Sequence, residues 1–426
     1  TLARVLRMLG HRVVTDNHIG DWGTQFGMLL LGWKTELNEA ALKQDPIAEL
    51  ERLYKSINAD ESRRDEARAE LVKLQAGDEE NLAIWQRMIA LSQEQFDHVY
   101  GRLGVTFDET LGESFYNPQL PRLIEELQGR GIAEESDGAM VVRFPDDQQL
   151  ADKPAIVRKR DGAANYTTTD LATLQYRMET WKPSDIVYVT DGRQQLHFQQ
   201  LFKIFGRWQN AASVQLEHVW FGSILGPDGK PFKTRSGDTV RLADLLDEAE
   251  ERAFAVVSEK NPDLLESERR KIARVVGLGA LKYADLSNNR QSDYIFDWDK
   301  MLALQGNTAP YLQYAYTRVR SIFRKMDAPN FDSVELQFKA PEELALAKHL
   351  MNFGQALEMV AQDYRPNFLC NYLFELAGHF SRFYEACPVL KAEASEQNSR
   401  LALCELTARV LRSGLDALGI EVTEVM

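Results

Sequence analysis

Residues 11–27, HRVVTDNHIGDWGTQFG, carry the clearest fold signal in the sequence. Its first part, HRVVTDN, predicts a short buried strand, which follows a helical apolar stripe ending at Gly10. The strand leads into a loop, residues 18–27, whose glycines permit tight turns. A glycine-rich loop at the carboxyl end of a parallel-type strand is where open α/β sheets bind ligands. The sequence therefore predicts an α/β domain with a ligand site at this loop.

Outward from this stretch, the α/β pattern is interrupted and then resumes. Residues 35–110 are dense in charged residues and carry apolar residues at helical spacing, so we predict a helical insertion. Residues 111–250 return to α/β character, with a strand at 185–190 (DIVYVT) that opens onto DGRQQLH. Residues 1–34 and 111–250 are therefore predicted to form one domain.

The rest of the chain is predicted to be helical. Residues 251–300 are expected to form a connector and residues 301–426 an all-helical domain. Apolar residues at steps of three and four predict three successive amphipathic helices, packed as a bundle, over residues 346–364, 369–383 and 401–418.

The composition fits a large globular protein. The 426 residues are 44% apolar and 27% charged, which suggests about two to four domains and excludes an intrinsically disordered chain. A net charge of −14 argues against a polybasic nucleic-acid coat protein, although a local basic strip can still bind RNA. Three cysteines without CxxC spacing predict free thiols, with neither a disulfide framework nor a zinc site. Because we find neither a signal peptide nor a membrane span, we expect a soluble, cytoplasmic protein.

Two acidic motifs are candidates for binding a planar cation. GESFYNP places Glu113 in a loop, and YTTTD places Tyr166 and Asp170 at a predicted helix start. Two carboxylates that converge from separate segments match the fork of a guanidinium group, which lysine cannot reproduce. Alternatives stay open, because the glutamate can be solvated surface and YTTTD can be a plain helix cap formed by Thr or Asp.

A further polar set follows the strand predicted at 185–190. Gln194 and His197 lie on the emerging turn, at the sheet edge where ligands bind, unless they are merely polar residues at a helix start. His218, in EHVWFGSILG, is another candidate, for which a purely structural role is the alternative.

Positive charge gathers in two places. The loop GKPFKTRSGDTV holds Lys230, Lys233 and Arg235 among glycines and hydroxyls, and such a cationic loop can follow charge on a transferring phosphate, unless it is a plain surface turn. It does not match the GxxxxGK[ST] phosphate loop. In NTAPYLQYAYTRVRSIFRK, residues 307–325, tyrosines are interleaved with arginines, which suits stacking on unpaired RNA bases, while the apolar residues between them can form core.

Together these motifs resemble arginyl-tRNA synthetase, a class I aminoacyl-tRNA synthetase family. The resemblance extends over essentially the whole chain, and the motifs stand in the family's order. It is carried by NHIGDWGTQFG (17–27), GESFYNP (112–118), YTTTDLA (166–172), DGRQQLH (191–197), HVWFGSILGPDGKPFKTRSGDTVRLADLLDEA (218–249), KYADLSNNRQSDYIFDW (282–298) and NTAPYLQYAYTR (307–318).

The resemblance implies a Rossmann-like class I catalytic domain with a helical insertion, followed by an all-helical anticodon-binding domain. The implied reaction joins L-arginine and ATP, which is accompanied by Mg²⁺, into arginyl-adenylate, with release of pyrophosphate. The arginyl group then passes to the terminal adenosine of tRNA(Arg). In this family the first step requires bound tRNA. We further expect a monomer, with no tightly bound cofactor and no metal site of its own.

The family's site residues carry over onto matching positions of this chain. Glu113 and Asp170 would hold the guanidinium group of arginine. Tyr166 would lie beside the substrate, and Gln194 near its α-amino end. The catalytic residues facing the phosphates would be Lys233 and Arg235. The implied ATP-binding residues are His18, Gly20, His197, His218, Phe221 and Gly222. The implied tRNA-binding residues are Tyr311, Tyr314, Arg318 and Arg320.

Two departures from the family matter. The His-x-Gly-His signature is absent, since the near match His18-Ile-Gly-Asp belongs to a different segment. We expect that signature just before Thr1, together with an N-terminal domain, and therefore a truncated chain with little or no activity alone. The basic loop reads PFKTRSG, with Thr234 in place of the second lysine of Lys-Met-Ser-Lys. A non-catalytic tRNA-binding fragment is the alternative function, and a cysteine synthetase is disfavoured because all three thiols lie in the C-terminal bundle.

Overall fold

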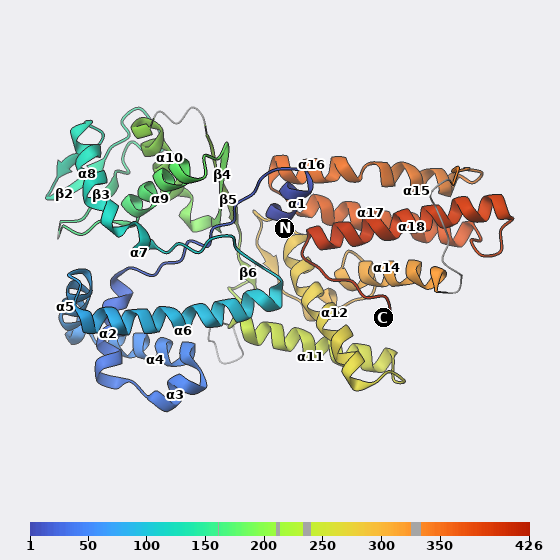
Figure 1. Ribbon diagram of the computed structural model, residues 1–426, viewed down its shortest axis with the longest axis horizontal. Coiled ribbons are helices and arrows are strands. Elements are labelled where there is room, and N and C mark those ends of the chain that lie inside the picture. Colours follow the sequence, from blue (N-terminus) through green and yellow to red (C-terminus); the bar gives the residue numbers. More distant parts are fainter. Residues whose placement is uncertain (161, 210–213, 233–239, 325–333) are drawn as a thin grey trace. The chain divides into compact units, whose positions relative to one another are not determined.

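The structure, a computed structural model, describes residues 1–160, 162–209, 214–232, 240–324 and 334–426 (Figure 1). The chain divides into two compact units, one of residues 14–218 and one of residues 1–13 together with 219–426. Each unit has its own apolar core. None of the helices in the described ranges is both long and apolar enough to cross a membrane.

The first part of the 14–218 unit is helical. It consists of α2 (Thr24–Glu36), α3 (Glu39–Gln44), α4 (Pro46–Ala59), a 3-10 turn (Glu61–Arg63), α5 (Arg64–Gln75) and α6 (Glu79–Leu103). The long helix α6 begins at an Asp78 cap, whose carboxylate accepts from the Asn81 N–H, and ends at Gly104 with φ +62°. Leu30, Leu53 and Met88 are buried in one core formed by these helices. Figure 1 shows α2, α4 and α6 lying together.

The second part of this unit mixes strands and helices. It contains α7 (Glu113–Tyr116), a 3-10 turn (Asn117–Gln119), α8 (Leu120–Gly129), β1 (Glu134–Ser136), β2 (Ala139–Val142), β3 (Ala155–Arg158), α9 (Tyr166–Thr180), β4 (Asp185–Asp191), a 3-10 turn (Gly192–Gln194), α10 (Gln195–Gln209) and β5 (Gln215–Phe221). Strands β1, β2 and β3 form an antiparallel sheet in that order, and β4 pairs with β5. The strand predicted at residues 185–190 is confirmed as β4.

Two local predictions, for residues 11–17 and for the start of α9, are wrong. Residues 11–17 form no strand, because the segment makes a single isolated bridge, Asp16 to Glu109, and the Val14 side chain is 36% exposed. A strand requires a ladder of bridges, and the neighbour around Glu109 lies in the loop between α6 and α7. Helix α9 is capped neither by Thr nor by Asp, since the Asn165 side chain accepts from the Tyr166 N–H and the threonines occupy the buried first turn.

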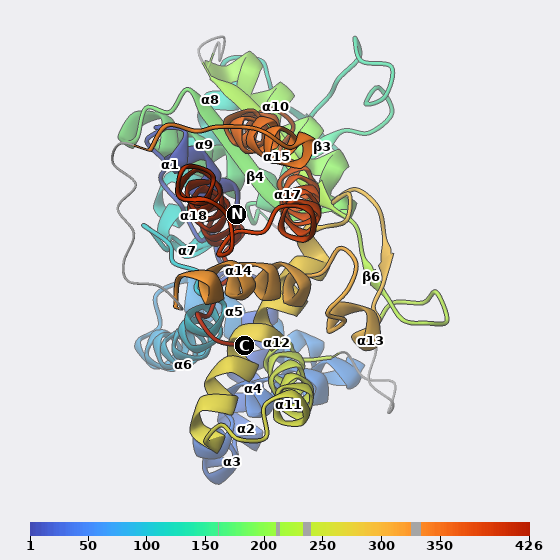
Figure 2. The same ribbon diagram turned by 90° about the vertical axis from the view of Figure 1, so that its right-hand side faces the viewer.

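The unit of residues 1–13 and 219–426 is mostly helical (Figure 2). Its elements are α1 (Leu2–Met8), β6 (Ile224–Leu225), α11 (Leu242–Lys260), α12 (Glu266–Leu286), β7 (Tyr294–Ile295), α13 (Trp298–Met301), α14 (Ala309–Phe323), α15 (Pro341–Met351), α16 (Phe353–Asp363), α17 (Asn367–Ala386) and α18 (Ala394–Ala417), besides the end of β5. Strands β6 and β7 pair in parallel. The three cysteines are buried free thiols, as predicted.

The predicted three-helix bundle contains four helices. The stripe predicted as one helix over residues 346–364 is divided between α15 and α16, because the helix breaks at Asn352. Leu346 in α15 and Leu357 and Val360 in α16 nevertheless belong to the same core, which is why the apolar spacing runs across the break. The helices predicted at 369–383 and 401–418 correspond to α17 and α18.

Candidate functional site

Two chain segments, residues 15–21 and 108–114, lie side by side and are here called the ribbon. The Asp108 carboxylate accepts from the Thr15 hydroxyl at 2.8 Å, and the Asn17 N–H donates to the Glu109 carbonyl at 2.9 Å. Further along, the Glu113 N–H donates to the Ile19 carbonyl at 3.0 Å. The ribbon thus fixes the backbone of Glu113 at the start of α7.

The end of the ribbon is closed around Asp21. Its carboxylate accepts from the Ser114 N–H at 2.8 Å and from the Ser114 hydroxyl at 2.6 Å. Gly112 is required here, because a Cβ at this position would overlap the Asp21 carboxylate. The Trp85 indole of α6 donates to the Asp21 carbonyl at 2.9 Å, which ties the helical part of the unit to the ribbon.

The first turns of α9 carry the second acidic motif. Asp170, whose side chain is only 18% exposed, lies 2.5 Å from His197 Nε2 through Oδ2 and 3.7 Å from His18 Nε2 through Oδ1. The Tyr166 ring meets the His197 ring edge-on, with the ring centroids 4.8 Å apart. The structure therefore gathers Tyr166, Asp170, His18 and His197 in one cluster, drawn from α9, the ribbon and α10.

Among the residues that the structure describes, the charged neighbours that act on Glu113 are the carboxylates of Asp170 and Asp21. Burial, followed by repulsion from the Asp170 and Asp21 carboxylates, raises the pKa of Glu113 from its usual value to about 7. Within the described ranges its carboxylate has no ion-pair partner. Several carboxylates that are partly withdrawn from water and not neutralised make a site that favours a cationic ligand.

Three other predicted residues of this unit, Gln194, Gly20 and His218, differ in their surroundings. Gln194 ends the 3-10 turn before α10, with an exposed side chain. Gly20 lies in the ribbon, and a Cβ there would come within 3.9 Å of Glu113 Oε1. His218 stacks on Phe198 at 4.3 Å and lies 2.8 Å from the Thr190 hydroxyl of β4, so it has structural contacts.

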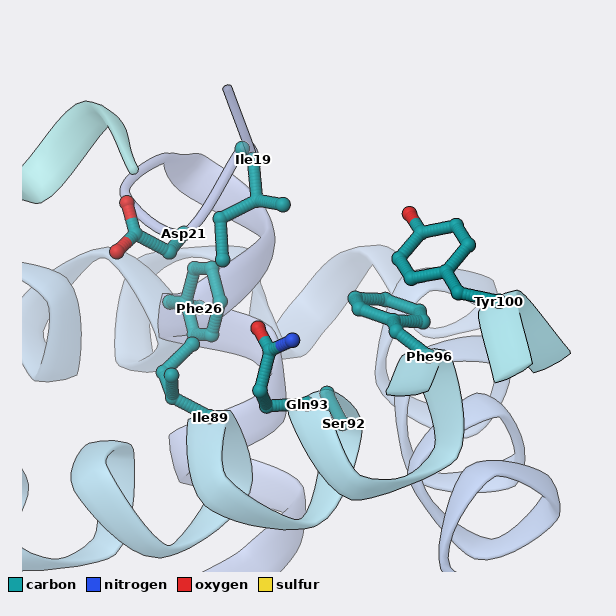
Figure 3. Close-up of a pocket in the computed structure, with 9 residues that line it drawn as sticks. Ile19, Asp21, Phe26, Ile89, Ser92, Gln93, Phe96 and Tyr100 are labelled. Carbon is teal, nitrogen blue, oxygen red and sulfur yellow. The ribbon is translucent and has the colours of Figure 1, made fainter. Parts of the chain in front are cut away.

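A cavity of about 240 Å³ lies on the helical side of the ribbon (Figure 3). It is lined by Ile19, Gly20 and Asp21, by Phe26 of α2, and by Ile89, Ser92, Gln93, Phe96 and Tyr100 of α6. Figure 3 shows the Phe96 and Tyr100 rings at one end and Asp21 at the other. This cavity was not predicted, although the step of four between Phe96 and Tyr100 places both rings on one helix face.

The remaining ATP-binding candidates lie in the other unit. The Phe221 side chain is 42% exposed. The Gly222 N–H donates to the Arg290 carbonyl at 2.8 Å, and a Cβ at Gly222 would come within 2.8 Å of the Ser292 backbone, so the close approach requires glycine. Lys233 and Arg235 lie outside the described residues.

The predicted tRNA-binding residues all lie on α14 but differ in their surroundings. Tyr311 packs against the core, whereas the Tyr314 side chain is 45% exposed. The Arg318 guanidinium lies over the Tyr384 ring, 4.7 Å from its centroid. Arg320 is already engaged, because it pairs with Glu405 at 3.2 Å and with Glu424 at 3.1 Å.

Two family models match the chain and cover most of it. Residues 1–298 match the class I tRNA synthetase (R) catalytic domain. Residues 312–426 match the DALR anticodon binding domain. The predicted fold class, a class I catalytic domain followed by a helical anticodon-binding domain, is therefore confirmed.

Similar proteins agree with this assignment. The chain is 49% identical to an arginine–tRNA ligase of Chromobacterium violaceum and 50% identical to one of Laribacter hongkongensis, in each case over 100% of this chain and 76% of the relative. Among solved structures, the arginyl-tRNA synthetase of Thermus thermophilus matches with a TM-score of 0.86 and 25% identity, over 100% of this chain and 78% of the other. That of Plasmodium falciparum matches with a TM-score of 0.85 and 28% identity, over 100% and 72%. The chain therefore belongs to the arginine–tRNA ligases, class I aminoacyl-tRNA synthetases that use ATP to join arginine to tRNA.

Proposed function

We propose that Glu113 and Asp170 bind the guanidinium group of L-arginine. The observation that supports this proposal is the half-buried Glu113 carboxylate, which has acidic neighbours and, within the described ranges, no ion-pair partner. A substrate guanidinium supplies the missing charge and donates to both carboxylates through its planar fork. Lysine offers a single point charge and does not match two acceptors in this way, so the same feature accounts for selection against lysine.

The neighbouring residues complete the arginine site. Tyr166 contributes its exposed ring beside the substrate, and Gln194 binds near the α-amino end. His197 and His18 are proposed to serve ATP binding together with Gly20, His218, Phe221 and Gly222. Their contacts with Asp170 support an additional task, because they hold that carboxylate in a fixed orientation next to the substrate.

The two steps place different demands on these groups. In the first, a carboxylate oxygen of arginine attacks the α-phosphorus of ATP, and pyrophosphate leaves. In the second, the terminal ribose hydroxyl of tRNA attacks the carbonyl carbon, the ester forms, and AMP leaves. ATP enters as its magnesium complex, and Lys233 and Arg235 stabilise charge on the phosphates. Binding of arginine through its side chain leaves its carboxylate free to react in both steps.

Recognition of tRNA is proposed to involve α14. Tyr314 offers an exposed ring for stacking on an unpaired base, and Arg318 a guanidinium for the phosphate backbone. Tyr311 and Arg320 would contribute less directly, since both are engaged within their own unit. We further propose that tRNA is needed for the first step, and that the protein works as a monomer in the cytoplasm.

Replacement of Asp170 tests the arginine site. Asp170→Ala removes charge-assisted hydrogen bonds worth about 1.5–3 kcal/mol each, so we expect the KM for arginine to rise about 100-fold. The KM for ATP should change less than about threefold, because ATP does not bind through this carboxylate. The assay is arginine-dependent ATP–pyrophosphate exchange with tRNA present, measured in a longer version of the protein that carries the His-x-Gly-His signature.

A matched control keeps the result interpretable. Asp185→Ala removes an exposed carboxylate at the start of β4 and should leave both KM values unchanged. An equal rise of the arginine and ATP KM values in Asp170→Ala would mean that the residue supports the fold and does not read the guanidinium.

A further inference from the structure

The two carboxylates of the arginine site are carried by different parts of the 14–218 unit. Glu113 belongs to the ribbon, where its N–H donates to the Ile19 carbonyl at 3.0 Å. Asp170 belongs to α9. The separation between the two carboxylates therefore depends on how firmly the ribbon is held against α9.

A buried ion pair between Asp16 of the ribbon and Arg177 of α9 joins these two parts. Arg177 Nη2 lies 2.7 Å and its Nε 3.2 Å from Asp16 Oδ2. The two side chains are only 8% and 6% exposed. Arg177 lies two helical turns after Asp170, and Asp16 two residues before His18, so each partner is close in sequence to a residue of the cluster.

The surroundings of the pair make it a firm link. The Tyr188 ring of β4 lies under the Arg177 guanidinium, 5.1 Å from ring centroid to guanidinium carbon. In this buried setting a charge-assisted contact is strong and permits little sliding of one partner over the other. Asp16 Oδ1 has no hydrogen-bond partner within the described ranges, so the pair is held through Oδ2.

We propose that the Asp16–Arg177 pair is a positioning element of the arginine site. It holds the ribbon against α9 and thereby sets the spacing of Glu113 and Asp170 to the width of a guanidinium group. It also neutralises Asp16, so that this carboxylate does not compete for the substrate cation. The inference rests on the proposed arginine site and assigns to Asp16 and Arg177 no contact with the substrate.

A purely structural role would predict a different response to substitution. Removing one partner of a buried pair destabilises a protein, whereas replacing both partners by apolar side chains of similar size is often neutral. Replacing both partners by apolar side chains thus preserves the core. It removes the guanidinium–carboxylate contact that, in this proposal, fixes the separation of Glu113 and Asp170. Because misplacement by about 1 Å can cost about 100-fold in a site that requires orientation, arginine binding should respond even when stability does not.

The test is the double variant Asp16→Leu/Arg177→Met in the full 426-residue chain. We expect a thermal midpoint within a few degrees of the parent, a dissociation constant for L-arginine raised at least about tenfold, and unchanged binding of magnesium–ATP, all by calorimetry. The matched control is Glu343→Leu/Arg400→Met, an equally buried pair of the other unit, which should leave arginine binding unchanged.

Normal arginine binding in the folded double variant would overturn the inference. If the double variant does not fold, Arg177→Lys decides, because it keeps the charge but lacks the fork. Weakened arginine binding at an unchanged thermal midpoint then supports the inference, and parental binding overturns it.

Asp170→Ala separates the two proposals. If Asp170→Ala binds arginine normally, the arginine site itself is wrong, whereas loss in Asp170→Ala with normal binding in the double variant removes the positioning role alone.

Discussion

Two glutamates, the half-buried Glu113 of the 14–218 unit and the buried Glu343 of the other unit, respond to their surroundings in opposite ways. Burial and the Asp170 and Asp21 carboxylates raise the pKa of Glu113 to about 7. Burial by itself would raise the pKa of Glu343 as well, but hydrogen bonds from the Ala340 N–H and the Arg400 guanidinium lower it below its usual value. Glu343, in the unit of residues 1–13 and 219–426, is paired with Arg400. Glu113, in the 14–218 unit, has no ion-pair partner among the described residues.

This difference indicates where binding energy is available. A buried carboxylate that already has its cation contributes to the fold and gains little from a ligand. A carboxylate held next to other carboxylates costs stability in the free protein, and a ligand of opposite charge removes that cost. The same contrast separates Glu113 from Asp16, whose charge Arg177 already balances. Proteins commonly give up stability in this manner at functional sites.

The largest expected effect comes from the satisfied glutamate. Glu343→Gln leaves Arg400 without its buried carboxylate partner, so we expect the free energy of unfolding at pH 8 to fall by about 2 kcal/mol. Because the folded pKa is depressed, this contribution is present above the unfolded pKa and is lost as the pH falls through the lower folded value. Urea unfolding at pH 8 measures this loss of stability. An unchanged midpoint would mean that Arg400 does not stabilise the fold through Glu343.

Glu113 should affect the pH dependence of stability in the opposite direction to Glu343. Its folded pKa of about 7 lies above the unfolded value, so its stabilising contribution is present below the unfolded pKa and is lost as the pH rises through about 7. Glu113→Gln removes the charge that destabilises the folded chain at high pH, so the ligand-free variant should be more stable than the parent at pH 8. We expect a gain of only about 1 kcal/mol in the free energy of unfolding, because partial exposure of Glu113 to water weakens the repulsion. At pH 5 the variant and the parent should differ little. Destabilisation at pH 8 would mean that Glu113 has a cation after all.

The smallest expected effect concerns α14, where one arginine is engaged by carboxylates and another lies over a ring. Removal of one phosphate contact lowers the slope of log binding constant against log salt by about 0.7–0.9. We expect Arg318→Ala to show this change in tRNA binding, and Arg320→Ala to weaken binding with a smaller change of slope, because Glu405 and Glu424 already balance its charge. Filter binding at several salt concentrations distinguishes the two variants. A larger change of slope for Arg320→Ala than for Arg318→Ala would mean that Arg320, and not Arg318, makes the main phosphate contact.

The elements that the sequence predicted well are those set by local pattern. Strand β4 follows from its apolar run, and α17 and α18 from their apolar spacing. The predicted strand at residues 11–17 failed because pattern alone does not supply a partner strand, and the break at Asn352 was hidden because both flanking helices share one core.

The candidate site could be predicted only where its residues stand in recognisable motifs. The motifs around Glu113, Tyr166 and Asp170, together with the negative charge that a guanidinium group requires, predict these three residues. The Asp16–Arg177 pair was missed, because its partners are 161 residues apart and neither belongs to a motif with an obvious task. One sequence signal points to Arg177. It stands three residues after Leu174, which places it on the same helix face, and both residues are buried in α9.

The ionisation of Glu113 on substrate binding can be measured as the number of protons released when L-arginine binds. If Glu113 has a pKa of about 7 in the free chain and is fully ionised beside the guanidinium, binding at pH 7 should release about half a proton. Calorimetry in two buffers of different ionisation enthalpy measures this number, and Glu113→Gln should bring it close to zero. Release that is absent in the parent chain, or unchanged in Glu113→Gln, would contradict the claim that Glu113 is the open carboxylate of the arginine site.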